Sequence, residues 1–298
     1  MKIRIGSRGS DLALWQAYYV RDLLQDLDHE VEIKIIETQG DKIQHLSFDK
    51  MEGKGFFTKE IEQSLLNKEI DLAVHSHKDL ETTPPDGLSI AAVSYRENPT
   101  DVLLMRPEAR DETKVLELKK NPIVGTSSAR RQSQIRRLRF DVQLKDLRGN
   151  VPTRINKLRE GQYDAIILAS AGIKRLKLDL SDLRVIELSP TNFIPAPAQG
   201  VLGLQVRSDH TDLHEALQVI HDKQVAELIG IEREILKGMD GGCQLPLGVY
   251  CLKEENEWTV YVSYAKDKTE EAEVSSYQSD DKEILIQTII EDLKYGIS

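Results

Sequence analysis

Short apolar stretches alternate with amphipathic stretches along most of this chain. Alternating or continuous apolar residues predict strands at 2–6, 31–38, 71–75, 89–93, 102–105, 122–124, 163–169 and 201–207, and another ending near 147. Apolar residues spaced by three or four predict helices at 11–27, 58–67, 152–160 and 213–237. In the first helix we expect a buried face formed by Leu12, Trp15, Tyr19, Leu23 and Leu27. Strands that alternate with helices are typical of an open α/β sheet that binds its ligand at the strand ends.

Two segments without helical pattern, near residues 98 and 194, read as crossings between domains. The second is rich in proline, Pro190 to Gly200, and the strand at 201–207 then rejoins the first sheet. This predicts a discontinuous first domain (1–98 and 198–218, carrying Asp79) and an inserted, arginine-rich second domain (99–197). The fold class is therefore α/β, with two periplasmic-binding-protein-like lobes that grip anions. Strands at 247–252, 258–265 and 272–277 and a helix at 280–295 predict a small α+β third domain (219–298) that carries the Cys243 loop.

The charge of the chain is unevenly distributed. The net charge is −10, yet residues 126–177 hold thirteen Lys and Arg against four acids, so this stretch carries +9 and the remainder −19. Part of such an island is ordinary solvated helix surface, but the excess favours an anionic ligand. No apolar run approaches the ~20 residues that span a bilayer. The N-terminus lacks the features of a signal peptide, and two cysteines cannot form a disulfide framework, so we expect a cytoplasmic protein.

Cys243 lies in the loop Gly241-Gly242-Cys243-Gln244-Leu245-Pro246. We expect the paired glycines to give the backbone access to positive φ and to leave the sulfur uncovered. A thiol in such a loop can carry a covalent group if positive charge nearby favours the thiolate. The alternative is an inert, buried cysteine that packs as a small hydrophobe.

Two strand–loop–helix units predict anion sites, because helix N-termini present free N–H groups and a positive dipole end. The first loop contains Arg8 and Ser10, and Ser10 equally suits a simple N-cap. The second is Gly125-Thr126-Ser127-Ser128-Ala129-Arg130-Arg131. Arginine is disfavoured in a first helical turn, so Arg130 and Arg131 indicate a bound carboxylate or phosphate.

Further charged residues follow strand ends or glycine-rich turns. Lys78 and Asp79 come directly after the strand at 71–75, where Asp79 offers a negative charge suited to a cationic intermediate; the alternative is a surface ion pair worth ~0–1 kcal/mol. His75 and His77 lack the spacing of a zinc motif, and we expect no metal. Other basic residues in such positions are Lys54, Arg148, Arg154 and Arg175. Six arginines in one cleft exceed the need of one small anion, so we expect a large or repeated ligand.

Several co-linear stretches resemble the porphobilinogen deaminase (hydroxymethylbilane synthase) family over nearly the full length. The resemblance is carried by Ser10-Asp11-Leu12-Ala13-Leu14-Trp15-Gln16-Ala17, Gly53-Lys54-Gly55-Phe56-Phe57, His75-Ser76-His77-Lys78-Asp79, Gly125-Thr126-Ser127-Ser128-Ala129-Arg130-Arg131-Gln132, Leu147-Arg148-Gly149-Asn150-Val151 and Gly241-Gly242-Cys243-Gln244.

The resemblance implies a transferase of tetrapyrrole (porphyrin and heme) biosynthesis with a dipyrromethane cofactor joined to Cys243 through a thioether. Porphobilinogen would lose ammonia to give an azafulvene, and four units would be condensed stepwise and released as hydroxymethylbilane. It further implies a monomer that uses neither metal, membrane nor nucleic acid, and whose product passes to uroporphyrinogen-III synthase.

The family's site residues carry over by position. Asp79 would be catalytic and would stabilise the cationic pyrrole nitrogens. The cofactor would be held by Lys78, Asp79, Ser128, Arg130, Arg131 and Asp41. The substrate and growing chain would be bound by Arg8, Ser10, Gln16, Lys54 (on a mobile loop over the cleft), Thr126, Ser127, Arg148, Arg154 and Arg175.

The chain departs from the family pattern at a few positions. His77 stands where Met is common, Leu80-Glu81 replaces an apolar-Pro pair, and Gln39 stands where Arg is frequent. Ala129 replaces Leu and Ala198 replaces Gly. Of these departures only Gln39 removes an assigned charge, so they bear on the electrostatics of the cleft and on the rate, not on the type of reaction.

Two other classes of function compete with a deaminase. A solute-binding protein or anion sensor shares lobes and arginines but needs neither Cys243 nor Asp79. A nucleic-acid binder would use the basic island, but the overall acidity and an aromatic content of 5% argue against it.

Overall fold

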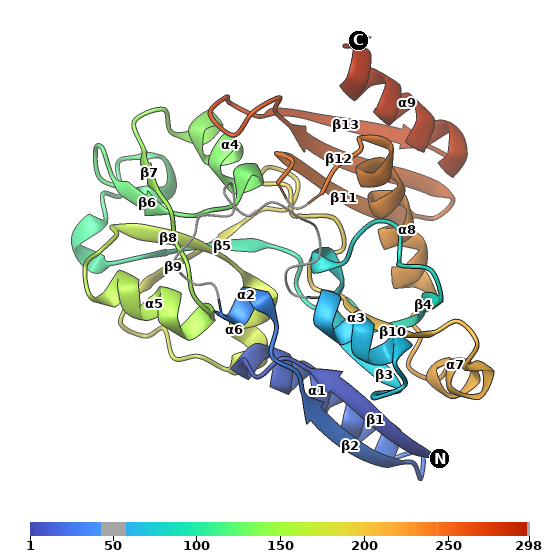
Figure 1. Cartoon of the computed structure of the whole chain (residues 1–298). Coiled ribbons are helices and arrows are strands. Elements are labelled where there is room, and N and C mark those ends of the chain that lie inside the picture. Colours follow the sequence, from blue (N-terminus) through green and yellow to red (C-terminus); the bar gives the residue numbers. More distant parts are fainter. Residues whose placement is uncertain (43–57, 243, 297–298) are drawn as a thin grey trace. The chain divides into compact units, whose positions relative to one another are not determined.

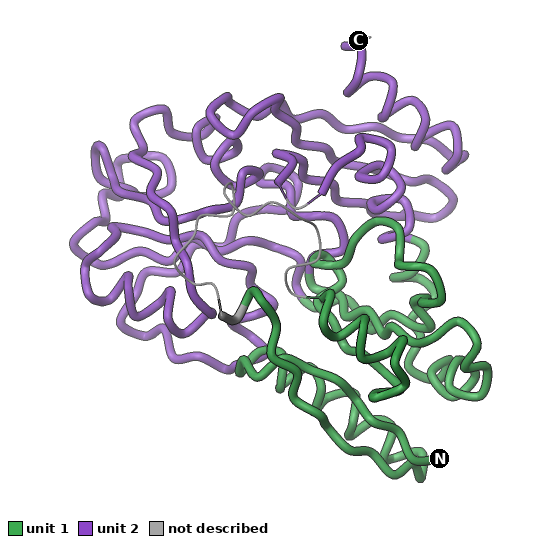
Figure 2. Tube along the Cα trace, viewed as in Figure 1, with its two compact units in different colours: residues 1–46, 51–97, 200–227 green, residues 47–50, 98–199, 228–298 purple. Residues whose placement is uncertain are grey.

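The computed structural model describes residues 1–42, 58–242 and 244–296, without the side chains of residues 41 and 42. Its elements form three sheets flanked by helices (Figure 1). The chain divides into two compact units, residues 1–46, 51–97 and 200–227 in unit 1 and residues 47–50, 98–199 and 228–298 in unit 2 (Figure 2). The predicted three-domain boundaries stay a prediction, although each predicted domain has its own sheet.

Unit 1 contains a five-stranded sheet of order β2-β1-β3-β10-β4. β1, β2 and β3 are parallel, and the returning strand β10 lies antiparallel between β3 and β4. This confirms the predicted discontinuous lobe. Its elements are β1 (Lys2–Ser7), α1 (Asp11–Gln25), β2 (Glu30–Ile35), α2 (Gln39–Lys42), α3 (Lys59–Leu66), β3 (Leu72–Ser76), the 3₁₀ turn η2 (His77–Asp79), β4 (Leu88–Val93), β10 (Leu202–Arg207) and α7 (Thr211–Leu217).

Unit 2 repeats the same plan in its first sheet, of order β7-β6-β8-β5-β9. Here the entering strand β5 lies antiparallel between β8 and β9, while β6 is parallel to β7 and β8. The fold class predicted from the sequence, two α/β lobes of one plan, is confirmed. The elements are β5 (Asp101–Met105), η3 (Pro107–Ala109), η4 (Val115–Glu117), β6 (Ile123–Gly125), α4 (Ala129–Leu138), β7 (Gln143–Lys145), α5 (Val151–Arg159), β8 (Ala165–Ala169), α6 (Ser170–Leu176) and β9 (Arg184–Leu188).

The C-terminal part of unit 2 is the predicted α+β segment. An antiparallel sheet β11-β12-β13 packs with α9. Its elements are β11 (Leu247–Glu254), β12 (Glu257–Tyr264), β13 (Glu273–Ser279) and α9 (Lys282–Tyr295), preceded by α8 (Lys223–Gly238), which begins in unit 1.

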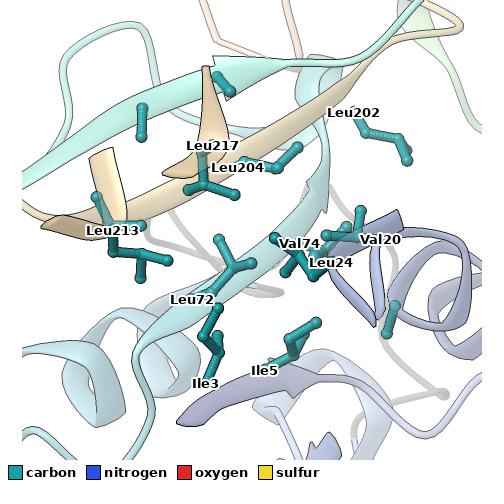
Figure 3. Close-up of a cluster of buried hydrophobic side chains, with 14 residues drawn as sticks. Ile3, Ile5, Val20, Leu24, Leu72, Val74, Leu202, Leu204, Leu213 and Leu217 are labelled. Carbon is teal, nitrogen blue, oxygen red and sulfur yellow. The ribbon is translucent and has the colours of Figure 1, made fainter. Parts of the chain in front are cut away.

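Each sheet has its own hydrophobic core. In unit 1, Ile3, Leu72 and Leu204 from neighbouring strands meet Val20 and Leu24 of α1 (Figure 3). In unit 2, successive residues of β5 point to opposite faces, so that Leu103 and Met105 join one core and Val102 and Leu104 the other. Residues 102–105 are all apolar because both faces of β5 are covered by a core.

The buried face of the first helix was predicted wrongly: the observed face is displaced by about one residue along the sequence. Gln16, Ala17, Val20 and Leu24 are the buried residues of α1, while Leu27 lies beyond the helix and is exposed. Trp15 and Tyr19 are half-buried at the edge of this face, where their rings stack with centroids 5.5 Å apart. Ring stacking beside the sheet, rather than burial under it, explains their helical spacing.

The helix predicted over 213–237 is two helices, α7 and α8. The chain turns between them because Asp222 begins a new helix, with its Oδ1 accepting the N–H of Val225 at 3.0 Å. His221 also leaves the helical path, since its Nδ1 accepts the N–H of Val93 at 3.2 Å. Polar side chains that bind backbone groups compete with helix continuation.

Candidate active site

The loop after β1 carries the first predicted anion site. Ser10 caps α1, its Oγ accepting the N–H of Ala13 at 3.4 Å. Ser7 Oγ donates to the carbonyls of Arg8 (3.1 Å) and Ala13 (3.0 Å), which fixes the loop from within. Arg8 is half-buried at the carboxyl end of β1. The capping role of Ser10 is therefore observed, and its role toward a substrate stays a prediction.

The carboxyl end of β3 presents Lys78 and Asp79. β3 is the parallel neighbour of β1, so both strands end at the same edge of the sheet. Gln16 joins the two segments, because its Nε2 donates to Oγ of Ser76 at 2.8 Å. The 3₁₀ turn η2 then leaves Lys78 partly exposed and the Asp79 carboxylate exposed. Arg8, Ser10, Gln16, Lys78 and Asp79 thus gather at one edge of unit 1.

A chain of buried polar side chains, which the sequence analysis did not predict, lies inside unit 1. His75 Nε2 and Gln205 Oε1 are 3.0 Å apart, and Gln205 Nε2 donates to Glu62 Oε1 at 3.0 Å. Burial lowers the pKa of His75 to about 4, so its ring is neutral at pH 7. Burial also raises the pKa of Glu62, and the charge of Glu81 acts in the same direction. Sequence spacing gives no sign of this chain, because its members come from α3, β3 and β10.

The hydroxyl-rich loop of unit 2 is held by its own contacts. Ser128 caps α4, with Oγ accepting the N–H of Arg131 at 3.5 Å. Ser127 Oγ donates to the carbonyl of Leu147 (3.1 Å) and accepts its N–H (3.0 Å). Thr126 Oγ1 accepts the N–H of Ser128 at 3.3 Å. The loop is therefore rigid before any ligand arrives.

Gly125 is required for packing. A Cβ at this position would lie 2.7 Å from the ring of Tyr163 and 3.0 Å from Ile166. The Tyr163 hydroxyl in turn donates to the carbonyl of Asp146 at 2.6 Å. Close packing against this ring therefore explains the glycine at position 125.

Arg130 and Arg131 bind a carboxylate of the chain itself. Arg130 Nη1 lies 2.8 Å from Oδ2 of Asp101, and Arg131 Nη2 lies 2.7 Å from Oδ1. Asp101 is fully buried. Burial alone would raise the pKa of its carboxyl, but the charges of Arg130 and Arg131 outweigh this and hold the pKa well below its usual range. The sequence predicted that these arginines bind a ligand anion; in the structure their carboxylate partner belongs to the fold, and their role toward a ligand stays a prediction.

Three more arginines follow strand ends of the same sheet. Arg148 and Arg154 come after β7, where Arg154 Nε donates to the carbonyl of Gly149 at 2.7 Å. Burial lowers the pKa of Arg148. Arg175, on α6 after β8, is 6% exposed. Since β6, β7 and β8 are parallel neighbours, their following loops meet at one edge of unit 2.

The loop that contains Cys243 is described up to Gly242. Neither Gly241 nor Gly242 has a positive φ, and the left-handed residue is Asp240, with φ 51°. The predicted freedom of this loop to enter positive φ is therefore not used at Gly241 or Gly242. A Cβ on Gly241 would lie 2.6 Å from Leu245 and 3.2 Å from the carbonyl oxygen of Leu236, whereas one on Gly242 would enter open space. Gly241 thus serves packing, whereas the space beside Gly242 is open.

Some predicted residues lie outside this description. Lys54 and Cys243 fall outside the described residues, as does the side chain of Asp41 on α2. Within the described ranges, no group of three or more His, Cys, Asp or Glu side chains is placed to hold a metal ion. None of the helices described is both long and apolar enough to cross a membrane.

A model of known protein families covers most of the chain. Residues 3–215 match the family described as "Porphobilinogen deaminase, dipyromethane cofactor binding domain". This chain belongs to the porphobilinogen deaminase family. The matched residues include the motifs around Asp79 and Arg130, whereas the Cys243 motif lies beyond residue 215.

Named relatives extend the match to most of their own length. The porphobilinogen deaminase of Maridesulfovibrio salexigens is 44% identical over 258 residues, covering 86% of this chain and 82% of that one. The porphobilinogen deaminase of Clostridium novyi is 43% identical over 254 residues, covering 84% of each. Among solved structures, the periplasmic VFT2 domain of Bordetella pertussis BvgS shares 14% identity at a TM-score of 0.44, covering 78% of this chain and 93% of that one.

Proposed function

We propose that this chain is a porphobilinogen deaminase, a transferase also called hydroxymethylbilane synthase. It condenses four porphobilinogen units in steps, releases ammonia at each, and frees the linear tetrapyrrole hydroxymethylbilane. The observation that carries the proposal is family membership over residues 3–215, together with relatives of this name that match most of both chains.

The residues near α4 fit a cofactor that carries carboxylates. Arg130 and Arg131 contribute two positive charges against the single negative charge of Asp101. Arg131 Nε is buried and has no hydrogen-bond partner in the described structure, which leaves a donor for an incoming acceptor. A dipyrromethane attached to Cys243 through a thioether would be held here by Arg130, Arg131 and Ser128, and in unit 1 by Lys78, Asp79 and Asp41. When bound, the dipyrromethane supplies the pyrrole carbon to which the first substrate unit is joined.

Asp79 suits the charged chemistry of substrate activation. Its exposed carboxylate lies at a strand end, beside Lys78 and outside the hydrophobic core. A fixed negative charge there stabilises positive charge that develops on the pyrrole nitrogen when ammonia leaves, and its oxygens can hold the nitrogen's proton. We assign Asp79 as the catalytic residue on this basis.

The remaining polar residues suit the carboxylates of each pyrrole unit. Guanidinium groups bind carboxylates through charge-assisted hydrogen bonds of ~1.5–3 kcal/mol each. The substrate and the growing chain would be held by Arg8, Ser10, Gln16, Lys54, Thr126, Ser127, Arg148, Arg154 and Arg175. Each pyrrole brings two carboxylates, which accounts for the number of arginines at these strand ends.

The setting of the reaction follows the same proposal. We place the enzyme in the cytoplasm as a monomer, with uroporphyrinogen-III synthase as the acceptor of its product. Size-exclusion chromatography with light scattering tests the monomer, and a coupled assay with that enzyme tests the acceptor.

Intact mass spectrometry of the purified protein tests the function. The wild-type chain should carry a covalent dipyrrole adduct, and Cys243→Ser should lack it and have no turnover of porphobilinogen. Cys251→Ser is the matched control, because Cys251 is buried in the C-terminal core and should not affect the adduct. A wild-type protein without adduct and without turnover would instead support a solute-binding protein of similar fold.

A further inference from the structure

Asp101 is the first residue of β5 and is fully buried at the carboxyl end of the parallel strand β8. Its two oxygens are shared among three donors. Oδ2 accepts from Arg130 Nη1 at 2.8 Å, and Oδ1 accepts from Arg131 Nη2 at 2.7 Å and from Gln199 Nε2 at 3.0 Å. One carboxylate therefore fixes both arginines of the first turn of α4.

The same arginines are also anchored to the backbone of unit 2. Arg130 Nη1 donates to the carbonyl of Ile194 at 2.7 Å, and Arg131 Nη1 donates to that of Ile167 at 3.0 Å. These bonds occupy Nη1 of each group and turn both planes toward Asp101. Fixed geometry of this kind is what carboxylate recognition by guanidinium requires.

The charges of this cluster do not cancel. Two guanidiniums and one carboxylate leave one positive charge in a largely buried place, where an unbalanced charge is costly. Arg131 Nε is in addition buried without a hydrogen-bond partner within the described part of the chain. Both observations point to an anionic group that completes the cluster.

A second ion pair, at the other end of α4, joins a buried arginine to a half-buried carboxylate and shows the contrast. Arg139, the C-cap of α4, binds Asp141 through Nε at 2.7 Å and Nη2 at 2.8 Å. This pair has one charge of each sign and is therefore neutral. It stabilises the fold without leaving charge for a ligand.

We propose that Asp101 is a positioning residue, which holds Arg130 and Arg131 in the orientation that receives carboxylates of the dipyrromethane. This inference rests on the proposed function and assigns a role to a residue that does not itself touch the ligand. Asp101 keeps two like charges side by side while leaving a net charge of +1 for the ligand.

The test compares Asp101→Asn with Asp141→Asn. Each substitution removes the charge of a carboxylate that pairs with arginine at one end of α4, fully buried for Asp101 and half-buried for Asp141, so both lower the melting temperature. Apo-protein is incubated with porphobilinogen, and intact mass spectrometry follows the fraction that carries the adduct, at a temperature where circular dichroism shows both variants folded. We expect loading at least tenfold slower in Asp101→Asn and within twofold of wild type in Asp141→Asn.

Equal loading of the two variants would overturn the proposal, because Asp101 would then act on stability alone. The wild type separates this result from failure of the proposed function. If wild-type protein acquires no adduct, the proposed function and this inference both fall. If wild type loads and Asp101→Asn loads as fast, only the positioning role falls.

A second comparison applies if Asp101→Asn does not fold. The double variant Asp101→Asn/Arg131→Gln removes one charge of each sign and is measured against Arg131→Gln alone. The cluster then carries +1 in the double variant and 0 in the single one. If net charge alone governed loading, the double variant would load faster. Positioning of Arg130 by Asp101 predicts the reverse, a loss of at least threefold, and equal or faster loading would refute it.

Discussion

The backbone N–H of Ala198 donates to Oε2 of Glu232 at 2.7 Å, and Ala198 itself has φ 60°. Oε1 of the same carboxylate accepts the N–H of Cys251 at 2.9 Å. Glu232 is fully buried on α8, so one side chain links the second crossing segment to strand β11 within unit 2. The left-handed residue is an alanine where the family commonly has glycine, and the Glu232 bond helps to hold it there.

Ala198→Gly should stabilise the protein. A left-handed backbone costs an L-residue ~1–2 kcal/mol, and glycine adopts it freely, which outweighs the added flexibility of the unfolded chain. We expect the free energy of unfolding to rise by about 1 kcal/mol, measured by urea denaturation. The control is Ala129→Gly, at a helical position of α4, which should lower stability. A lower stability for Ala198→Gly would mean that the buried Cβ contributes more than the strain costs.

Glu232→Leu should destabilise the protein strongly. The change leaves the N–H groups of Ala198 and Cys251 buried without their acceptor, at ~1–3 kcal/mol each. We expect a loss of about 3 kcal/mol in urea denaturation, and a smaller loss for Glu232→Gln, which keeps one acceptor oxygen. Glu234→Gln on the same helix is the control, because Glu234 is exposed and, among the described residues, its ion pair is with Lys237 at 3.7 Å. Its stability should stay within ~0.5 kcal/mol of wild type.

Asp79→Asn should abolish most turnover and leave the fold intact. The exposed carboxylate contributes little to stability, so the unfolding midpoint should change by less than the equivalent of ~0.5 kcal/mol. Loss of a fixed charge at the reacting centre costs ~10²–10³ in kcat. The measurement is hydroxymethylbilane formation, with Asp86→Asn, in an exposed turn, as the control. Undiminished turnover of Asp79→Asn would remove Asp79 from the mechanism.

The free energy of unfolding should decrease when the pH is lowered from 7 to 5, and His75 should cause this decrease. The folded state lowers the pKa of His75 from 6.5 to about 4, so in this range the unfolded state binds a proton that the folded state does not. Stability therefore decreases as the pH falls below 6.5, by about 2 kcal/mol at pH 5. Urea denaturation at both pH values should show this loss in wild type and not in His75→Gln.

His29→Gln is the control for this pH effect, because His29 is only partly buried, at the protein surface, where it lies 3.2 Å from the N-terminal amine. Glu62 has the opposite effect on stability. Burial raises the pKa of its carboxyl, so the folded state is favoured at low pH and this stabilisation is lost as the pH rises. The comparison of wild type with His75→Gln isolates the histidine. Equal losses in the two proteins would contradict the prediction.

Gln16 and Ser76 should be coupled. Their hydrogen bond of 2.8 Å joins α1 to the strand that leads into Asp79. We expect Gln16→Leu to raise KM for porphobilinogen and to lower stability by about 1 kcal/mol. A double-mutant cycle with Ser76→Ala should give a coupling free energy of ~0.5–1.5 kcal/mol. A coupling of zero would show that the bond does not position this segment.

Much of the fold could be predicted because its signals are local. The strands at β3, β5 and β8 follow from continuous apolar runs, and α5 follows from Asn150 and Pro152 at its start, where Asn150 caps the helix. The helix over 213–237 failed because its apolar spacing continues through a turn that His221 and Asp222 create by binding backbone N–H groups. Local periodicity cannot detect such competition, since one acceptor contacts a strand 128 residues away.

For the candidate site, the sequence predicted which polar residues occur and which strands they follow. The loops after β1, β3, β6 and β7 contain the predicted polar residues, because parallel neighbours end at one edge of a sheet. The sequence also predicted that Arg130 and Arg131 bind a carboxylate or phosphate of a ligand. It could not predict Asp101, which lies 29 and 30 residues earlier and is indistinguishable by spacing from a surface acid.

The sequence by itself determined the family, the two repeated α/β sheets and the polar residues at their edges, since these depend on motifs and periodicities within short windows. Only the tertiary structure decided which charges are paired inside the protein. Asp101 with its two arginines, Glu232 with two backbone N–H groups, and His75 with Gln205 and Glu62 are partners brought together by packing of distant segments. Each of these polar groups needs its partner because an unpaired polar group costs free energy in the low-polarity interior. The partners lie far apart in the sequence, so short windows of residues do not reveal them.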